Sequence, residues 1–299
     1  MKPNISIDKN TNIPFLQLFI RSDPYICQYI LSSDSMEKFA VIQPCPFLKP
    51  YIKQYWLLKT VGEPVSLART VPAGMMNLIL HRGNRLLSIQ DHEYHPRVFL
   101  SGHEKTFADL EYSGQIDMVS VVFRPAGVRA FFNLPMNKVN NLRVTADDLG
   151  DKELAELEKA FTNTENDRIC ILMIEQFLLK RLRKLTEYNL QRIETAIRLI
   201  DSGQTDVAAL ASASCLSPKQ FKRIFSEHIG ANPKEFSRTI RFQRALHILE
   251  THSQISLTAL AYECGYYDQS HLIKEFKALS GYTPSEYLAI CLPHSDYFN

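Results

Sequence analysis

The 299-residue sequence predicts an α+β protein in two parts, a small antiparallel β-barrel domain with helices and then an all-α domain. Two observations predict it. The last third contains one helix-turn-helix pattern twice, and matching positions such as Ser217 and Asp268, or Phe225 and Phe276, lie 51 residues apart. The first 165 residues instead hold short apolar runs separated by Gly, Asn, Asp and Pro, which is typical of strands joined by turns.

The predicted strands lie in the first 165 residues. Apolar or alternating runs occupy residues 78–80, 86–89, 98–100, 107–110 and 118–123. Prolines at 44–46 and 72–74 fit turns between these elements. We therefore expect an N-terminal β-rich domain over residues 1–165.

A helical segment of unusual composition follows. Residues 168–185 keep a helical period but are apolar nearly all round, more than one domain surface needs. We expect this helix to pack on the barrel and on a partner chain, with an interdomain segment over 166–188 and an all-α domain over 189–292. The charged stretch 180–184 is either a solvated linker or a phosphate contact.

Helix boundaries in the repeat follow from cap residues. Ser217 and Asp268 are N-cap types, and each precedes a helix with one apolar face. Gly230 and Gly281 fall just past these helices, where a left-handed cap favours glycine. Prolines follow three residues later, at Pro233 and Pro284 in the sequence, and prevent the helices from continuing.

The first repeated helix has a buried and a basic face. Apolar side chains at i, i+3 and i+4 share the inward face, and basic side chains share the outer face. The inward set is Phe221, Ile224 and Phe225, and the outward set is Lys219, Lys222 and Arg223. Such a helix suits the major groove of DNA.

Residues from about 190 to 288 resemble the DNA-binding domain of the AraC/XylS family of bacterial transcription regulators. The resemblance is carried by the second unit, residues 261–287 with Gly265-Tyr266-Tyr267-Asp268, and by the linking stretch 241–249. The alternative is a helical protein-interaction domain that happens to repeat. The resemblance implies seven helices, with a connecting helix that holds two recognition helices about 34 Å apart, so that one chain reads two successive major grooves of double-stranded DNA.

The resemblance also implies the base-reading residues. They are Lys219, Lys222 and Arg223 in the first unit and Gln269, Ser270, His271 and Lys274 in the second. Arg223 suits the O6 and N7 of guanine, and Gln269 suits an adenine edge. Lys274 stands where the family often has arginine, which weakens base reading there. Ile273 either contacts a thymine methyl or packs against a neighbouring helix.

Other partners are implied by the same resemblance. RNA polymerase is an expected partner, and the N-terminal half often mediates homodimerisation in this family.

The stretch 51–56, the 71–74 turn, Gly102 and residues 123–127 together resemble a cupin-like sensor domain found on some members, over roughly residues 38–160. Such a barrel is the usual place for a small effector. Candidate effector-binding residues are Trp56, Tyr55, Met75, Asn77, His81 and Arg124; for Trp56 and Tyr55 the alternative is a place in the core or at a domain interface.

Composition limits the classes of function. The net charge is only +2, so DNA binding depends on local basic clusters such as Lys219, Lys222, Arg223, Arg238, Arg241 and Arg244. No apolar run has membrane-spanning length, so we expect a cytoplasmic protein without a membrane partner. The six cysteines are scattered without a C-x-x-C pair, which predicts reduced thiols, with Cys215 and Cys264 as small buried residues in the two turns.

Catalysis is not expected. No Ser/His/Asp set, phosphate-binding glycine loop or paired acids appear. His92, His95, His103 and Glu104 have the residue types of a metal site, but solvated loop chemistry explains them better, so we expect neither metal nor cofactor. The predicted function is a DNA-binding transcription regulator modulated by an effector. Alternatives are a ligand-independent regulator controlled by abundance or a protein partner, and an enzyme of alkylated-DNA repair fused to the same module, which would need a cysteine cluster for zinc.

Overall fold

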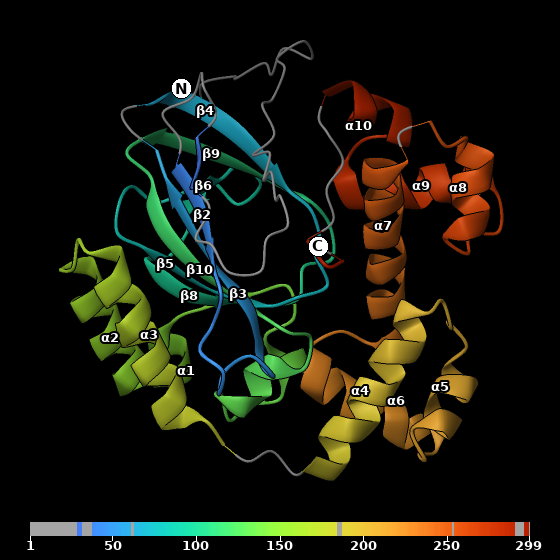
Figure 1. The fold of residues 1–299 in the computed structure, drawn as a ribbon, viewed down its shortest axis with the longest axis horizontal. Coiled ribbons are helices and arrows are strands. Elements are labelled where there is room, and N and C mark those ends of the chain that lie inside the picture. Colours follow the sequence, from blue (N-terminus) through green and yellow to red (C-terminus); the bar gives the residue numbers. More distant parts are fainter. Residues whose placement is uncertain are drawn as a thin grey trace, which may run out of the picture.

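The computed structural model describes residues 29–31, 38–60, 63–183, 187–252, 254–290 and 296–298. Strands dominate the N-terminal part and helices the C-terminal part, so the predicted α+β class is confirmed (Figure 1). The long helix α7 stands at the centre of the helical part (Figure 1). Among the described helices, none combines the length and apolar character that crossing a membrane requires.

Two antiparallel sheets form the N-terminal part. The larger has the order β1-β2-β3-β10-β5-β8-β11 and the smaller β4-β9-β6-β7. The strands of the larger sheet are β1 (Tyr29–Leu31), β2 (Lys38–Ile42), β3 (Ile52–Lys59), β10 (Asp117–Phe123), β5 (Asn77–His81), β8 (Val98–Ser101) and β11 (Arg143–Val144). Those of the smaller sheet are β4 (Glu63–Thr70), β9 (Ala108–Gly114), β6 (Leu87–Ser88) and β7 (Glu93–Tyr94). Each of the five apolar runs that predict strands overlaps one of these elements, although the run 86–89 extends beyond β6 at both ends.

The two faces of the larger sheet have different neighbours. One face packs against α2 (Lys152–Thr162) and α3 (Asp167–Arg181), with α1 (Ala146–Leu149) beside them (Figure 1). Leu57, Leu78 and Leu80 share this buried cluster with Phe161 and Ile174. The other, inner face turns toward the smaller sheet. There Leu58 and Met118 of the larger sheet pack on Ala68 and Tyr112 of the smaller one.

Within the described residues, seven helices form the C-terminal part, the number that the resemblance implies. They are α4 (Glu187–Asp201), α5 (Val207–Ala213), α6 (Pro218–Ile229), α7 (Pro233–Thr251), α8 (Leu257–Glu263), α9 (Gln269–Ser280) and α10 (Pro284–Ile290). Helices α4 and α6 contact one end of α7, and α8 and α9 contact the other (Figure 1). Each end therefore has its own core, one around Phe225 and Phe236 and one around Phe242 and Phe276.

The two parts touch along the turn before β5 and the ends of β4 and β9. The buried amide of Gln243 on α7 donates to the Pro72 carbonyl at 2.8 Å. The guanidinium of Arg69 on β4 donates to the Ser280 carbonyl at 3.3 Å and lies over the Tyr282 ring at 4.4 Å. The 3-10 helix η2 (Met136–Lys138) packs on α6, after a first one, η1 (Gly127–Ala130). The N-terminal part thus contacts both helix-turn-helix units.

The expectation that both turn cysteines are buried is wrong for Cys215. Cys264 is buried, but Cys215 is exposed and has a φ of 53°. Its counterpart is Gly265, with a φ of 74°, so both turns place a left-handed residue here. A side chain at this position points to solvent. Cys45 is half-buried and Cys170 buried, both free thiols, whereas Cys27 and Cys291 lie outside the described residues.

Candidate nucleic-acid interface

The first recognition helix, α6, begins and ends as its sequence predicts. The Ser217 hydroxyl accepts from the Gln220 amide N–H, and the Gln220 side chain accepts from the Ser217 N–H, which completes a capping box. Gly230 closes the helix in the left-handed region, with a φ of 93°. Because Phe221 and Phe225 are completely buried, the rotation of α6 about its axis is fixed.

This rotation exposes the predicted base-reading side chains. Lys219, Lys222 and Arg223 are all exposed on α6. The Arg223 guanidinium lies 3.1 Å from the Glu227 carboxylate, one turn further along. Since an exposed i,i+4 pair of this kind contributes only about 0.3–0.5 kcal/mol, Glu227 can release Arg223 to a stronger acceptor.

The second recognition helix, α9, has the same frame. The Asp268 carboxylate accepts from the His271 amide N–H at 2.7 Å, and Gly281 caps the end with a φ of 80°. Leu272 and Phe276 are completely buried. Three of the four predicted base-reading side chains are therefore exposed, namely Gln269, Ser270 and Lys274.

Two of the residues on α9 have partners that fix their orientation. The Gln269 side-chain oxygen accepts from the Thr258 hydroxyl at 3.0 Å, so the amide nitrogen faces away from α8. His271 is half-buried, and its Nδ1 accepts from the Tyr267 N–H at 3.3 Å. Ile273 is also half-buried. Gln269 thus presents a donor, while His271 is turned toward the protein.

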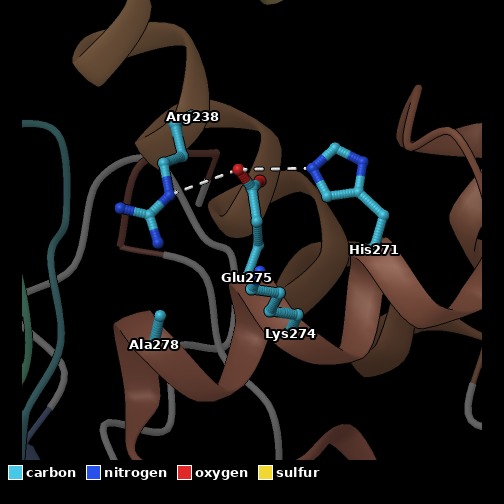
Figure 2. Close-up of a pocket in the computed structure, with 5 residues that line it drawn as sticks. All are labelled: Arg238, His271, Lys274, Glu275 and Ala278. Carbon is cyan, nitrogen blue, oxygen red and sulfur yellow. Dashed lines mark ion pairs between the residues drawn. The ribbon is translucent and has the colours of Figure 1, made fainter.

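A carboxylate joins α9 to the connecting helix, and no sequence argument anticipated it. Glu275 lies 2.6 Å from Arg241 on α7. It also lies 3.3 Å from Arg238 on the same helix and 3.5 Å from the His271 ring (Figure 2). Lys274 and Ala278 complete the pocket around this carboxylate (Figure 2). A signal was present in the repeat, because 51 residues before Glu275 stands Ile224, a buried apolar residue.

The predicted basic cluster is therefore divided in the structure. Arg241 is directed to Glu275, and its side chain is only 17% exposed. Arg244 donates to the carbonyls of Ile200 and Asp201, which tie α4 to α7. The α6 residues remain exposed, so the basic surface is smaller than the composition of the stretch suggested.

Helix α7 sets the separation of the two units. Its 19 residues correspond to about 28 Å at 1.5 Å per residue. One turn of DNA is about 34 Å, so the two recognition helices, at opposite ends of α7, are separated on the scale of successive major grooves.

The six candidate effector-binding residues do not meet at one site. Trp56, Asn77 and His81 lie on the inner face of the larger sheet by their pairing with Ser120, Val122 and Met118. Strand alternation places Tyr55 on the opposite face, where its hydroxyl donates to Glu175 on α3 at 3.2 Å. The remaining two candidates lie outside the strands: Arg124 is exposed and donates to the Lys49 carbonyl, and Met75 is buried two residues before β5.

The four residues with metal-ligand side chains are also dispersed. His92 is exposed in a turn, with a φ of 58°, whereas His95 packs against His81 with ring centroids 6.4 Å apart. His103 contacts Phe236 of α7, next to Glu104 in the chain. Solvated loop chemistry is thus wrong for His95 and His103, which are buried. Within the described ranges, no three His, Cys, Asp or Glu side chains come together as a set of metal ligands.

Comparison with known proteins gives the C-terminal part a family. Residues 210–290 match a family described as a helix-turn-helix domain. An uncharacterized HTH-type transcriptional regulator of Haemophilus influenzae is 37% identical over 100 residues, 32% of this chain and 33% of the relative. The arabinose operon regulatory protein of Escherichia coli is 26% identical over 135 residues, 42% of this chain and 46% of the relative. The C-terminal part of the chain is therefore an AraC-type helix-turn-helix domain.

The N-terminal part of the chain matches a different family. Residues 40–145 match a domain of unknown function, DUF6597. The structure of ToxT from Vibrio cholerae aligns with 79% of this chain and 98% of that chain, at 13% identity and a TM-score of 0.42. The present chain matches the Haemophilus influenzae and Escherichia coli relatives over between a third and half of their length. Both relatives are regulators by their names.

Proposed function

We propose that this protein is a sequence-specific transcription regulator whose α6 and α9 enter successive major grooves of double-stranded DNA. One observation carries the proposal. Two helices with the same caps and the same buried face lie at opposite ends of α7, and each exposes polar or basic side chains. The base-reading set is the predicted one, namely Lys219, Lys222, Arg223, Gln269, Ser270, Lys274 and, more weakly, His271.

The test starts from DNA that the full-length protein selects from genomic fragments. Arg223→Ala is expected to weaken binding to the selected site by about 1–3 kcal/mol and to relax the preference at one base pair. Lys159→Ala is the control, because Lys159 is exposed on α2, away from the recognition helices. An equal loss on selected and random DNA would show that Arg223 contacts only phosphate. If the full-length protein selects no DNA sequence at all, the proposed function itself is rejected.

The N-terminal part serves as the regulatory half in this proposal, with residues 1–165 as its domain and 189–292 as the DNA-binding domain. A barrel interior filled by Phe, Leu and Ile side chains would favour a ligand-independent regulator. The inner face of the larger sheet instead carries Trp56, Asn77 and His81, and this supports modulation by an effector. Such a regulator acts in the cytoplasm on RNA polymerase at its promoters.

The proposal includes a homodimer, because helix α3 has apolar side chains on its exposed side. Its buried side faces the sheet, but Ile169, Leu172 and Leu179 are 48%, 49% and 38% exposed on the other side. A dimer would bring two DNA-binding domains together and raise affinity through effective concentration. Sedimentation should give a dimer at micromolar concentration and a monomer for Leu172→Lys. The control Leu142→Lys, at a residue 53% exposed outside α3, should remain a dimer. A monomeric wild-type protein would contradict this part.

A further inference from the structure

The inner face of the larger sheet carries polar side chains among its apolar ones, and most of these polar side chains are buried. Its central strands β3, β10, β5 and β8 alternate between two faces, and antiparallel partners share a face. The inner face carries six side chains with polar atoms, namely Gln54, Trp56, Asn77, His81, Ser101 and Ser120. On the opposite face, the same strands place Leu57, Leu78, Leu80, Val98, Leu100, Val119 and Val121 against the helices.

Several polar atoms on this face, and on the neighbouring His95 ring, have no hydrogen-bond partner. Within the described residues, both ring nitrogens of His81 and His95 are buried without a hydrogen bond, as are Trp56 Nε1 and Asn77 Oδ1. His81 is completely buried and His95 is 7% exposed. Buried polar groups are nearly always paired, and each unpaired one costs about 1–3 kcal/mol. Several on one face indicate that a partner is supplied from outside the chain.

The unpaired groups surround a common area. The His81 and His95 rings lie 6.4 Å apart, and Phe99 lies 6.2 Å from the first and 5.3 Å from the second. Trp56 lies two strands from His81 on the same face, since β10 separates β3 from β5. Trp56 and His81 are also offset by two residues along the strands, so their positions on the sheet are about 12 Å apart, a distance that one small organic molecule can bridge.

The charge state of the rings restricts what can bind. Burial, followed by the nearby cations Arg97 and Arg85, lowers the pKa of His81 to about 4. Burial and Arg143 lower the pKa of His95 to about 3, although Asp91 opposes this shift. Both rings are therefore neutral at pH 7, and each offers one donor and one acceptor.

No formal charge on this face favours an ionic ligand. The four central strands place no Asp, Glu, Lys or Arg on it, as their pairing shows within the described ranges. Arg143, on the edge strand β11, is paired with the Asp91 carboxylate at 2.9 Å. Arg97 donates to the backbone carbonyls of His81 and Arg82. Arg85 is exposed, with its guanidinium over the Tyr94 ring at 5.6 Å. An anion bound on the inner face would therefore be desolvated without a buried, unpaired cation to compensate it.

We propose that this inner face binds an uncharged organic molecule that both donates and accepts hydrogen bonds and has a flat face to lie against Trp56 or Phe99. His81, His95 and Asn77 supply the polar contacts. The assignment of this molecule as the effector rests on the proposed regulatory function, but the binding itself does not.

Trp56 provides the readout, because it is the only tryptophan in the chain. Its fluorescence and the melting temperature of the full-length protein are measured with matched pairs of probes at millimolar concentration. The pairs are nicotinamide and nicotinate, glucose and gluconate, and adenosine and adenosine monophosphate. The expected result is saturable binding of at least one neutral member and none of its charged partner. Preference for charged members, or no response to any probe, overturns the proposal.

Variants separate a ligand site from an interior that holds only water. His81→Phe and His95→Phe should weaken the neutral probe about tenfold or more, and should keep or raise the melting temperature of the free protein, because unpaired buried polar atoms are removed. His92→Phe, on the exposed turn, is the matched control and should bind normally. Loss of stability in both ring variants with unchanged probe binding would assign the histidines a structural role and overturn the proposal.

The outcomes for binding and for regulation can be distinguished. DNA binding by the same preparation is measured with and without the neutral probe. If the probe binds while the protein selects no DNA, the regulatory function fails and the site stands. If DNA is selected but no neutral probe binds, the site fails and the regulatory function stands.

Discussion

The two helix-turn-helix units share a frame but differ in how the recognition helix is held. Both helices begin at an oxygen-bearing cap, Ser217 or Asp268, and both end at a left-handed glycine. In the first unit, the recognition helix α6 turns Ile224 toward the protein, where it packs in an apolar cluster. In the second unit, the same position is Glu275, which contacts two arginines of α7.

This difference shows that a repeat can preserve geometry while the interactions behind it change. Ile224 contributes by excluding water, and this contribution is insensitive to charge. Glu275 contributes by pairing with Arg241, so its contribution to stability depends on both partners being present. Both units contact the N-terminal part, the second through Arg69 and the first where Gly230 lies against Met136.

The largest expected effect is that of Glu275→Ala, which leaves Arg241 without its carboxylate. Because both side chains are less than a fifth exposed, we expect a loss of about 2–4 kcal/mol in the free energy of unfolding. Ile224→Ala, the counterpart, should cost a similar amount by leaving a cavity. Urea unfolding at low and high salt separates the two, because only the Glu275 effect should shrink with salt. The same salt dependence for both would contradict a distinct mode of attachment.

The next largest effects on stability are expected at the glycines that end the two recognition helices. An alanine Cβ at Gly281 would meet the Arg69 guanidinium and lie 3.0 Å from the Phe107 ring. Gly281→Ala should therefore cost about 2 kcal/mol, and Gly230→Ala, 3.3 Å from the Met136 carbonyl oxygen, about 1 kcal/mol. Gly265→Ala is the control, since nothing lies within 4 Å of its Cβ. Equal melting temperatures for the three variants would refute this order.

A smaller effect is expected from Thr258, which orients Gln269 in the second unit only. Thr258→Val keeps the shape but removes the hydroxyl that donates to Gln269, so the amide can rotate. We expect the base preference at one position to change by about 1 kcal/mol, measured by binding to a randomised operator. Thr258→Ser should retain the wild-type preference. An unchanged preference in the valine variant would mean that Gln269 does not read a base.

The smallest expected effect concerns pH. His228 in the first unit is buried, and its Nδ1 lies 2.8 Å from the Ile224 carbonyl, whereas the second unit has Leu279 at this position. Burial, the largest cause, lowers the pKa of His228 in the folded state. The unfolded state then binds more protons, so stability is lost as pH falls through the unfolded pKa of about 6.5. His228→Leu should flatten the melting temperature of the full-length protein between pH 7 and 5. A steeper decline in the variant would reverse the sign and reject the argument.

The local features of both units follow from the sequence alone. Cap residues, glycine stops and the spacing of Phe221 and Phe225 act within a few residues, so their pattern predicts each helix and its exposed face. The constant offset then predicted the second helix from the first. The alternation of short apolar runs predicted the strands for the same local reason.

Only the tertiary structure decided which distant residues meet. Glu275 and Arg241 are 34 residues apart, and Arg69 and Ser280 are 211 apart, so no local period relates them. His81 and His95 were assigned to different candidate sites by sequence, yet the strand pairing brings their rings together. Tyr55 and Trp56 were grouped because they are neighbours, but the pleat separates them. Local patterns specify helices, strands and their faces, whereas contacts between elements depend on the packing of the whole core.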